Sequence, residues 1–338
     1  MAHEPKLTVY NLTIKPYNEK IENSNRWLFR NIIGEANNDT LTDEFIITDI
    51  FRKFIAALDT PEMYTDTISK KCMTANQINL ADDNVNTNII LHSEECIFEG
   101  IIEGGTYGRR RNKTNTRNKT NKTNVDEGDA ITEDFYFLIY MPLHSNKITL
   151  LIQSYSDDAI DRVMHKFWKN FFCYETIFYQ PKISRFVPKS IIEDFKNNAT
   201  ISSLTFSTEI PSETLLEKTI KTTTRNYKVT VSVKPTKDDI PMDEFEDTVD
   251  QIQETLFTSS MHLSQFTNKT GMLKDNSTNK SSPFDLGSSF AIKPSILLSK
   301  YIVINENASD FERIRKYCFM LLKEIKCEIY PEYAVRVR

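Results

Sequence analysis

The most distinctive chemistry in this sequence is a run of positive side chains between residues 109 and 122, called here the basic segment. The surrounding stretch "GGTYGRRRNKTNTRNKTNKTN" (104–124) has no acidic residue, although the 338-residue chain has a formal net charge of −5. Guanidinium and ammonium groups set among Asn and Thr can bind phosphate oxygens through charge-assisted hydrogen bonds. The basic segment therefore predicts contact with a polyanion through Arg109, Arg110, Arg111, Lys113, Arg117, Lys119 and Lys122.

A second interpretation treats the basic segment as the disordered tip of a hairpin. Its cations repel one another, and it contains no apolar side chain that could enter a core. The acids of "DEGDAITED" (126–134) follow directly and could neutralise the cations within the chain when no partner is bound. Both interpretations keep the segment outside any packed core.

Further cations are expected on the polar face of a strongly amphipathic segment. Large apolar side chains recur at i, i+3 and i+4 spacing up to Phe172, which predicts a helix over 156–172 with Ser156 as its N-cap. The opposite face would be either an ordinary solvated surface or a phosphate contact formed by Arg162, His165, Lys166 and Lys169. Lys234 and Lys237, at the end of a strand predicted over 226–235, complete the candidate contacts.

The sequence lacks the familiar motifs of metal, nucleotide and hydrolase sites. It contains no H-E-x-x-H, C-x-x-C, G-x-S-x-G or G-x-x-x-x-G-K-[ST] pattern, so we predict no cofactor and no metal site. One triplet, Glu324-Ile325-Lys326, has the Glu-x-Lys form that contributes to a shared metal ion in some nucleases. Because it falls in a predicted helix rather than a strand, a metal-dependent nuclease is kept only as an alternative.

The elements that must position these side chains divide the chain near residue 175. In the first half, alternating apolar residues predict strands, and apolar residues at helical spacing predict a helix over 42–58 capped by Thr42. The expected strands are 6–16, 94–108, 133–143 and 146–155. The last two should form a hairpin. The first half is thus predicted as a domain over 1–175, an antiparallel meander with amphipathic helices and one long basic loop over 109–124.

The second half repeats this mixture of elements on a smaller scale. Helices are expected over 187–198, 240–257 and 309–330, the last opening with a capping box of Ser309 and Glu312. Strands are expected over 200–210, 226–235 and 294–304, and residues 258–289 are expected to be mostly loop. We therefore predict an α+β protein whose second domain, 176–338, is a smaller sheet with helices.

Composition limits the class and the location of the protein. Hydrophobic residues form 39 % of the chain, enough for packed cores, and the longest apolar run, Phe135 to Met141, is too short to span a bilayer. The start of the chain has no signal-peptide pattern, and the five cysteines are widely spaced. These features predict a cytoplasmic protein without a transmembrane segment. The abundance of Asn, Lys and Ile suggests a bacterial genome rich in A and T.

One unit in the second half carries a resemblance to known proteins. The strand-like "YKVTVSVKPTKDD" (227–239) is followed by the helix-like "FEDTVDQIQETLF" (245–257), then by a polar stretch and a terminal helix. This layout resembles bacterial anti-phage defence proteins, namely the soluble DNA-binding component of Kiwa systems and the Rex-type exclusion protein of temperate phage. The resemblance implies an intracellular defence role through binding of DNA or of a partner protein.

These observations lead to one main functional hypothesis and two alternatives. The main hypothesis is a non-catalytic nucleic-acid-binding protein of bacterial defence, with DNA favoured over RNA. The alternatives are a protein-sensing adaptor that uses an exposed strand edge or an aromatic surface, and the metal-dependent nuclease described above. A protein encoded in the same operon and a second copy of this chain are further candidate partners.

Overall fold

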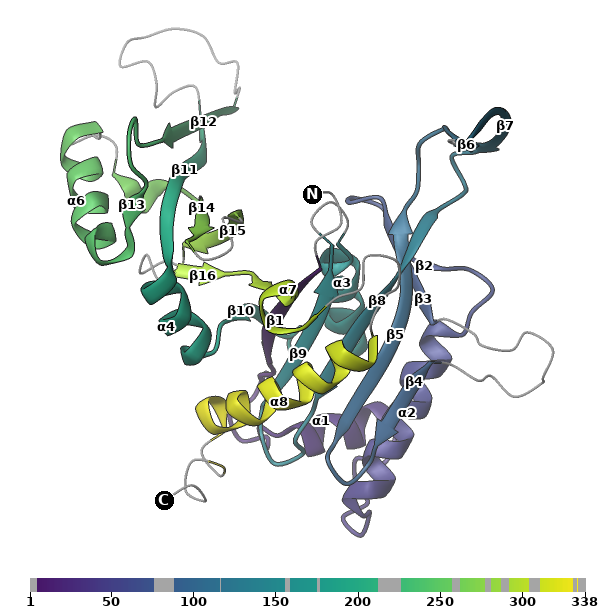
Figure 1. Ribbon diagram of the computed structural model, residues 1–338. Helices are drawn as coiled ribbons and strands as arrows, with labels where there is room; N and C mark the ends of the chain where they lie inside the picture. Colours follow the sequence, from purple (N-terminus) through teal and green to yellow (C-terminus); the bar gives the residue numbers. More distant parts are fainter. Residues whose placement is uncertain are drawn as a thin grey trace, which may run out of the picture. The chain divides into compact units, whose positions relative to one another are not determined.

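The chain forms two compact units (Figure 1). Unit 1 comprises Met1–Phe186 and Leu297–Arg338, and unit 2 comprises Val187–Ile296. The computed structural model describes residues 5–75, 88–115, 117–155, 159–174, 177–211, 226–256, 262–276, 281–286, 292–303, 311–330 and 333. Both units combine antiparallel strands with helices, which confirms the predicted α+β class.

The division between the units differs from the boundary expected near residue 175. Unit 1 continues to Phe186 because strand β10 (Lys182–Phe186) pairs with the first strand, β1 (Lys6–Thr13). The terminal segment from Leu297 also belongs to unit 1, so unit 2 is an insertion between two parts of unit 1. A helical pattern reveals that a segment has an apolar face. It does not reveal which sheet that face will cover.

Unit 1 is built on a nine-stranded sheet in the order β10-β1-β9-β8-β5-β3-β2, with β4 beside β5 and β17 beside β1. The strands not yet introduced are β2 (Tyr64–Asp66), β3 (Lys71–Ala75), β4 (Ile89–His92), β5 (Ile97–Thr106), β8 (Ile131–Tyr140), β9 (Lys147–Ser154) and β17 (Ile296–Leu297). The expected hairpin joins β8 to β9, which pair antiparallel. Strands β2, β3 and β4 were not predicted.

Helices cover both faces of this sheet (Figure 1). One face packs against α1 (Asn25–Ile33), α2 (Asp43–Leu58) and α3 (Asp161–Phe171), and the other is covered by α8 (Phe311–Ile329). Neighbouring residues of β5 show the alternation: Phe98 stacks on Phe54 of α2, whereas Glu99 bonds Arg315 of α8. The short helix α7 (Leu298–Tyr301) precedes α8.

Of the three predicted helix caps, one is confirmed and two lie outside the described residues. The Thr42 hydroxyl accepts a hydrogen bond from the Phe45 amide at 3.2 Å, which confirms this residue as the cap of α2. Helix α3 begins at Asp161 rather than 156, and Ser156 lies outside the described residues. Ser309, the expected cap of α8, also lies outside them.

The basic segment forms paired strands instead of the expected loop. Strands β6 (Arg111–Asn115) and β7 (Asn118–Val125) overlap it; they pair antiparallel and are called here the basic hairpin. Strands β5 and β8 already pair as far as Thr106 and Ile131, so the ends of the segment are held side by side. Closing a hairpin between fixed neighbours costs little additional chain entropy, and its β-branched Thr residues favour extended backbone.

Unit 2 has a smaller sheet in the order β12-β11-β14-β15-β16, with β13 beside β11. Its elements are α4 (Lys189–Asn198), β11 (Ala199–Pro211), β12 (Asn226–Val233), β13 (Ile240–Pro241), α6 (Phe245–Leu256), β14 (Asn268–Asp275), β15 (Ser281–Leu286) and β16 (Ile292–Pro294). Short 3₁₀ turns occupy Met242–Glu244 and Leu263–Gln265.

Two predictions for this part of the chain are wrong. Residues 258–289, expected to be mostly loop, contain β14 and β15. Strand β14 buries Gly271, Leu273 and Asp275 at alternate positions, and two of these residues give no apolar signal. Residues 294–304, expected as a strand, instead include the end of β16, the two-residue β17 and the helix α7.

Candidate nucleic-acid interface

The basic hairpin is anchored where β5 and β8 end. Tyr107 donates its amide hydrogen to the Lys70 carbonyl at 3.1 Å, and Gly108 donates to the Glu127 carbonyl at 3.0 Å. Gly108 has a φ of +85°, a left-handed conformation that glycine adopts without steric cost. These bonds fix the direction in which the chain leaves the sheet, and Figure 1 shows β6 and β7 extending beyond the ends of β5 and β8.

The strand register distributes the cations over both faces of the hairpin. Arg111 lies opposite Val125 and Lys113 opposite Thr123, so these two cations share one face. Thr114 lies opposite Lys122, which places Lys122 on the other face. Arg111, Lys113 and Lys122 are all exposed. A polyanion could therefore meet positive charge from either side of the ribbon.

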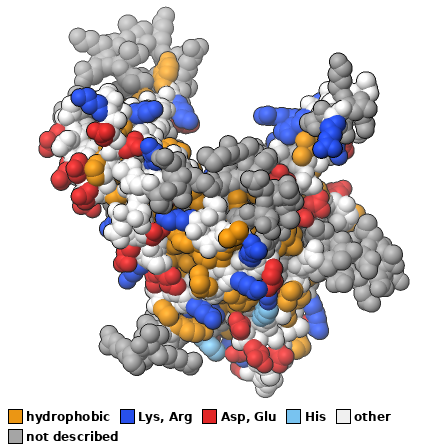
Figure 2. Space-filling view, in the orientation of Figure 1, with side chains coloured by type: hydrophobic (Ala, Val, Ile, Leu, Met, Phe, Trp, Pro, Cys, Tyr) orange, Lys and Arg blue, Asp and Glu red, His pale blue; other side chains and the backbone are white. Residues whose placement is uncertain are grey.

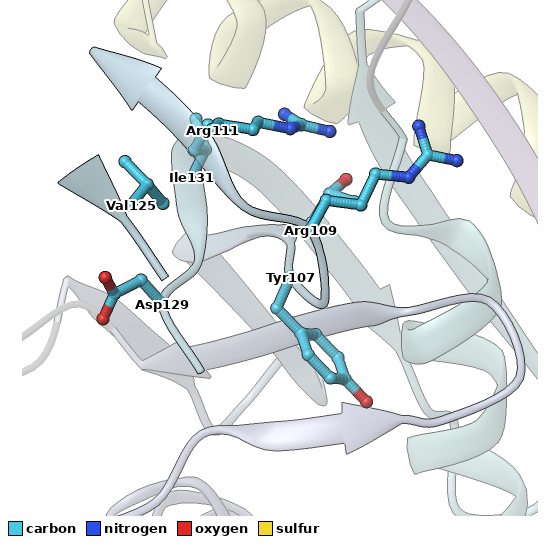
Figure 3. Close-up of a pocket in the computed structure, with 7 residues that line it drawn as sticks. Tyr107, Arg109, Arg111, Val125, Asp129 and Ile131 are labelled. Carbon is cyan, nitrogen blue, oxygen red and sulfur yellow. The ribbon is translucent and has the colours of Figure 1, made fainter. Parts of the chain in front are cut away.

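Two arginines at the base of the hairpin, Arg109 and Arg111, present their guanidinium groups on the same side. Figure 3 shows the side chains of Arg109 and Arg111 extending to the same side, whereas the carboxylate of Asp129 lies apart from both guanidinium groups. The hollow between the residues at this base has no volume that admits a water molecule. The base is therefore a closed surface that presents two guanidinium groups, and it is suited to phosphate contact rather than to enclosure of a small ligand.

The acidic residues that follow the hairpin contact it and shape the turn that leads to β8. A carboxylate oxygen of Glu127 lies 3.9 Å from Nε of Arg110, and the side chains of Glu127 and Arg110 are 72 % and 80 % exposed, respectively. A pair this exposed contributes little free energy, because water screens it. Asp129 accepts a hydrogen bond from the Asp126 amide at 2.8 Å and so shapes the turn. The described contact at Arg110 is weak enough for a phosphate group to replace it.

The cations of α3 do not form the solvated stripe that the sequence suggests. His165 packs edge-on against Tyr10, with 4.2 Å between ring centroids, and burial lowers its pKa to about 4, with Lys169 adding to the shift. The Lys166 ammonium donates to the Thr65 carbonyl at 3.2 Å and so ties α3 to β2. Arg162 is exposed and Lys169 half-buried. These two remain as candidate phosphate contacts on α3.

A lysine that sequence reasoning missed lies at the hairpin base. The Lys70 ammonium stands 5.5 Å from the centroid of the Tyr107 ring, close enough for a cation–π interaction. Lys70 sits in the turn between β2 and β3 with a φ of +56°. The strand pattern around it is too short to signal a turn, so the sequence offers no means of placing this charge beside the hairpin.

The two lysines predicted in the second half form a separate group. Lys234 directly follows β12, and Lys237 lies in the turn before β13. Both side chains are exposed. Since they belong to unit 2 and the basic hairpin belongs to unit 1, we treat them as an independent surface.

The Glu-x-Lys triplet has the geometry of an ordinary helix end. Lys326 places its ammonium 4.0 Å from the centroid of the Tyr140 ring, and burial lowers its pKa. Glu324 precedes it on α8, in the last two turns of the helix. Within the described residues, no group of three or more His, Cys, Asp or Glu side chains is arranged to hold a metal ion.

A buried charge cluster of unit 1 attaches α8 to the sheet. Glu99 is buried on β5 and accepts hydrogen bonds from Arg315 at 2.8 Å and from Tyr136 at 2.9 Å. His92 lies 3.2 Å from the same carboxylate. Burial, with further contributions from Cys318 and Glu99, raises the pKa of Tyr136, so its hydroxyl stays protonated as a donor. This cluster holds α8 in place against the sheet.

Comparison with known proteins assigns no family to these features. No protein-family model matches the chain, and neither curated proteins nor solved structures show significant similarity to it. The resemblance carried by residues 227–257 therefore stays a prediction. None of the described helices combines the length and apolar character needed to cross a membrane.

Proposed function

We propose that this protein binds nucleic acid without catalysis, and that the basic hairpin makes the principal contact with duplex DNA. The observation that carries the proposal is a paired two-stranded ribbon with cations on both faces, in a chain whose net charge is −5. A positive arm on a negative protein concentrates attraction to a polyanion in one place. A disordered loop would not contain strands that pair antiparallel along this segment, with one irregularity between Thr114 and Asn115.

The form of the hairpin favours duplex DNA over other nucleic acids. A two-stranded β-ribbon fits the major groove of B-form DNA, whereas the major groove of A-form RNA is too narrow for side chains to read. The five residues of β6 span roughly 17 Å, which exceeds the groove depth of about 8.5 Å. Single-strand binders stack bases on aromatic rings, and residues 109–124 contain no aromatic residue.

The proposed biological setting is bacterial defence against phage. Its support is the resemblance of the strand–helix unit at 227–257 to defence proteins that act by binding. In this setting the hairpin supplies DNA affinity, and Lys234 and Lys237 supply a second phosphate contact from unit 2. Protection of a bacterial culture from phage, compared between the natural chain and a hairpin variant, tests this part of the proposal.

The central experiment replaces charge without removing the hairpin. One variant changes Arg109, Arg110, Arg111 and Lys113 to Gln. A control changes four exposed cations elsewhere on unit 1, Lys15, Lys20, Arg52 and Lys53, to Gln. Fluorescence anisotropy with a labelled duplex, at salt concentrations from about 50 to about 200 mM, measures both the affinity and its salt dependence.

The hairpin variant should bind much more weakly and with a shallower dependence on salt. If all four cations contact phosphate, the slope of log affinity against log salt falls by about 3.6. The control should keep the natural slope, although both variants change the net charge equally. Equal losses in the two variants would show that only overall charge matters, and the proposed interface would be wrong.

A further inference from the structure

Helix α8 exposes one large apolar side chain, Met320, on an outer face that otherwise carries mostly charged residues. Its inner face is buried against the sheet through Ile314, Cys318, Leu321, Leu322, Ile325 and Ile329. On the outer face Met320 is 60 % exposed, and Val303, close to the end of α7, is 75 % exposed. Because the core is already complete without them, these side chains are available to a partner.

Two hollows flank this outer surface. The larger has a volume of about 480 Å³ and runs between α7 and α8, with walls that include Tyr301, Val303 and Tyr317. The smaller has about 280 Å³ and includes Phe319. Both are also lined by Met320, so they adjoin one ridge of α8, and we call the pair the α8 groove.

The rim of the α8 groove is positively charged. Arg313, Arg315, Lys316 and Lys323 are among the lining residues, and none of the described lining residues is acidic. Figure 2 shows Lys and Arg side chains set among hydrophobic surface where α8 lies in Figure 1. Arg315 is held by Glu99, and Arg313 donates to the Val303 carbonyl at 2.7 Å, which fixes the wall of the larger hollow. Lys316 lies 3.3 Å from Glu312, in a pair whose side chains are both mostly exposed.

We propose that the α8 groove docks an acidic amphipathic helix from a partner protein. Apolar side chains of such a helix would enter the two hollows on either side of Met320, and its Asp and Glu residues would meet Lys316 and Lys323. The hollows open along the outer face of α8, as the exposure of Val303 and Met320 shows, so they suit side chains inserted from a long ligand. The site acts independently of DNA binding by the hairpin.

The same charges argue against two other occupants. In a symmetric dimer the α8 groove would face itself, and its cations would then oppose one another. A membrane surface could take up the exposed Met320 and Val303, but it would leave the two hollows beside them unfilled. A separate acidic helix satisfies both the shape and the charge.

The test uses the full chain and two synthetic fluorescent helices with the same apolar stripe, one with Glu and one with Lys at the remaining positions. Anisotropy should show saturable binding of the Glu peptide and at least tenfold weaker binding of the Lys peptide. Met320→Glu and the double variant Lys316→Glu with Lys323→Glu should each weaken binding of the Glu peptide at least tenfold. The control Lys53→Glu, at an exposed position of α2, should leave it unchanged.

Several results would overturn the proposal. These are equal binding of the two peptides, no binding by the natural chain, or binding that Met320→Glu leaves intact. Concentration-dependent dimers, or uptake by phosphatidylserine vesicles, that Met320→Glu abolishes would assign the groove to another occupant. All variants should keep the natural thermal unfolding and DNA affinity, because they lie outside the core and the hairpin. This separates failure here from failure of the proposed function.

Discussion

His165 is a titrating side chain placed where its charged form is unfavourable. It lies against the Tyr10 ring, and its Nε2 atom has no hydrogen-bond partner among the described residues. Burial is the main cause that lowers its pKa from 6.5 to about 4, and Lys169 adds to the effect. The folded state therefore binds a proton at His165 less readily than the unfolded state does.

This difference predicts a loss of stability in mild acid. Above pH 6.5 the imidazole is neutral in both states, so it has no effect on the free energy of unfolding. As the pH falls from 6.5 to about 4 the unfolded state takes up the proton first, and stability decreases by on the order of 3 kcal/mol. Urea unfolding at several pH values within this window measures the decrease.

The variant His165→Gln isolates the contribution of the imidazole. All other titrating groups, including the nearby Asp161, are common to the two proteins, so the difference between their pH profiles reports His165. The variant should lose less stability than the natural protein between pH 6.5 and 4. Parallel profiles would mean that His165 keeps an ordinary pKa in the folded protein.

At Gly105, β5 lies too close to the backbone of β8 to admit a side chain. This close pairing comes just before the two strands lead into the basic hairpin. A Cβ atom added to Gly105 would lie 1.9 Å from the Ile131 carbonyl oxygen, one residue before β5 ends. Backbone on both strands would have to move apart to admit it. Gly128, in the turn after β7, has nothing within 4 Å of the same added atom.

We therefore expect Gly105→Ala to lower the free energy of unfolding by about 1–3 kcal/mol. Gly128→Ala adds the same methyl group in open space and should change it by less than about 0.5 kcal/mol. The midpoint of urea unfolding compares the two variants. An equal effect of both substitutions would show that the pairing of β5 with β8 tolerates a side chain at this point.

Long apolar patterns made most of the helices predictable. In α2 the large residues Ile47, Ile50, Phe54 and Leu58 recur at helical spacing and are buried as expected. Strands β5, β8 and β9 have enough apolar residues to stand out as well. By contrast, β2 has three residues and β14 buries a glycine and an aspartate, so neither carries a recognisable alternation. Strand pairing in such segments depends on distant neighbours.

The candidate interface was only partly predictable for a related reason. Charge density alone identified Arg109 and Arg111, because a run of cations needs no structural knowledge to recognise. The same criterion also selected Lys166, which packs against β2, and it overlooked Lys70, which reaches Tyr107 from another strand connection. Whether a surface lysine is available to a partner depends on contacts that residues distant in sequence make.

Every strand of the nine-stranded sheet belongs to unit 1, except that Ile296, the first residue of β17, is the last residue of unit 2. Phe186, the last residue before the insertion, lies opposite Val9, and β17, at its end, also pairs with β1. Both junctions therefore lie along one strand of unit 1. The fold of unit 1 requires no long loop to reconnect the chain if residues 187–296 are removed.

A chain in which a short Gly-Ser linker replaces residues 187–296 should fold and unfold cooperatively, as measured by circular dichroism during urea titration. Since it keeps the basic hairpin, it should also bind duplex DNA in a salt-dependent manner. If Lys234 and Lys237 each contact a phosphate, removing them lowers the salt slope by about 1.8. A folded unit 1 that no longer binds would move the principal DNA contact to unit 2. A shortened chain that fails to fold would show that the units depend on each other for stability.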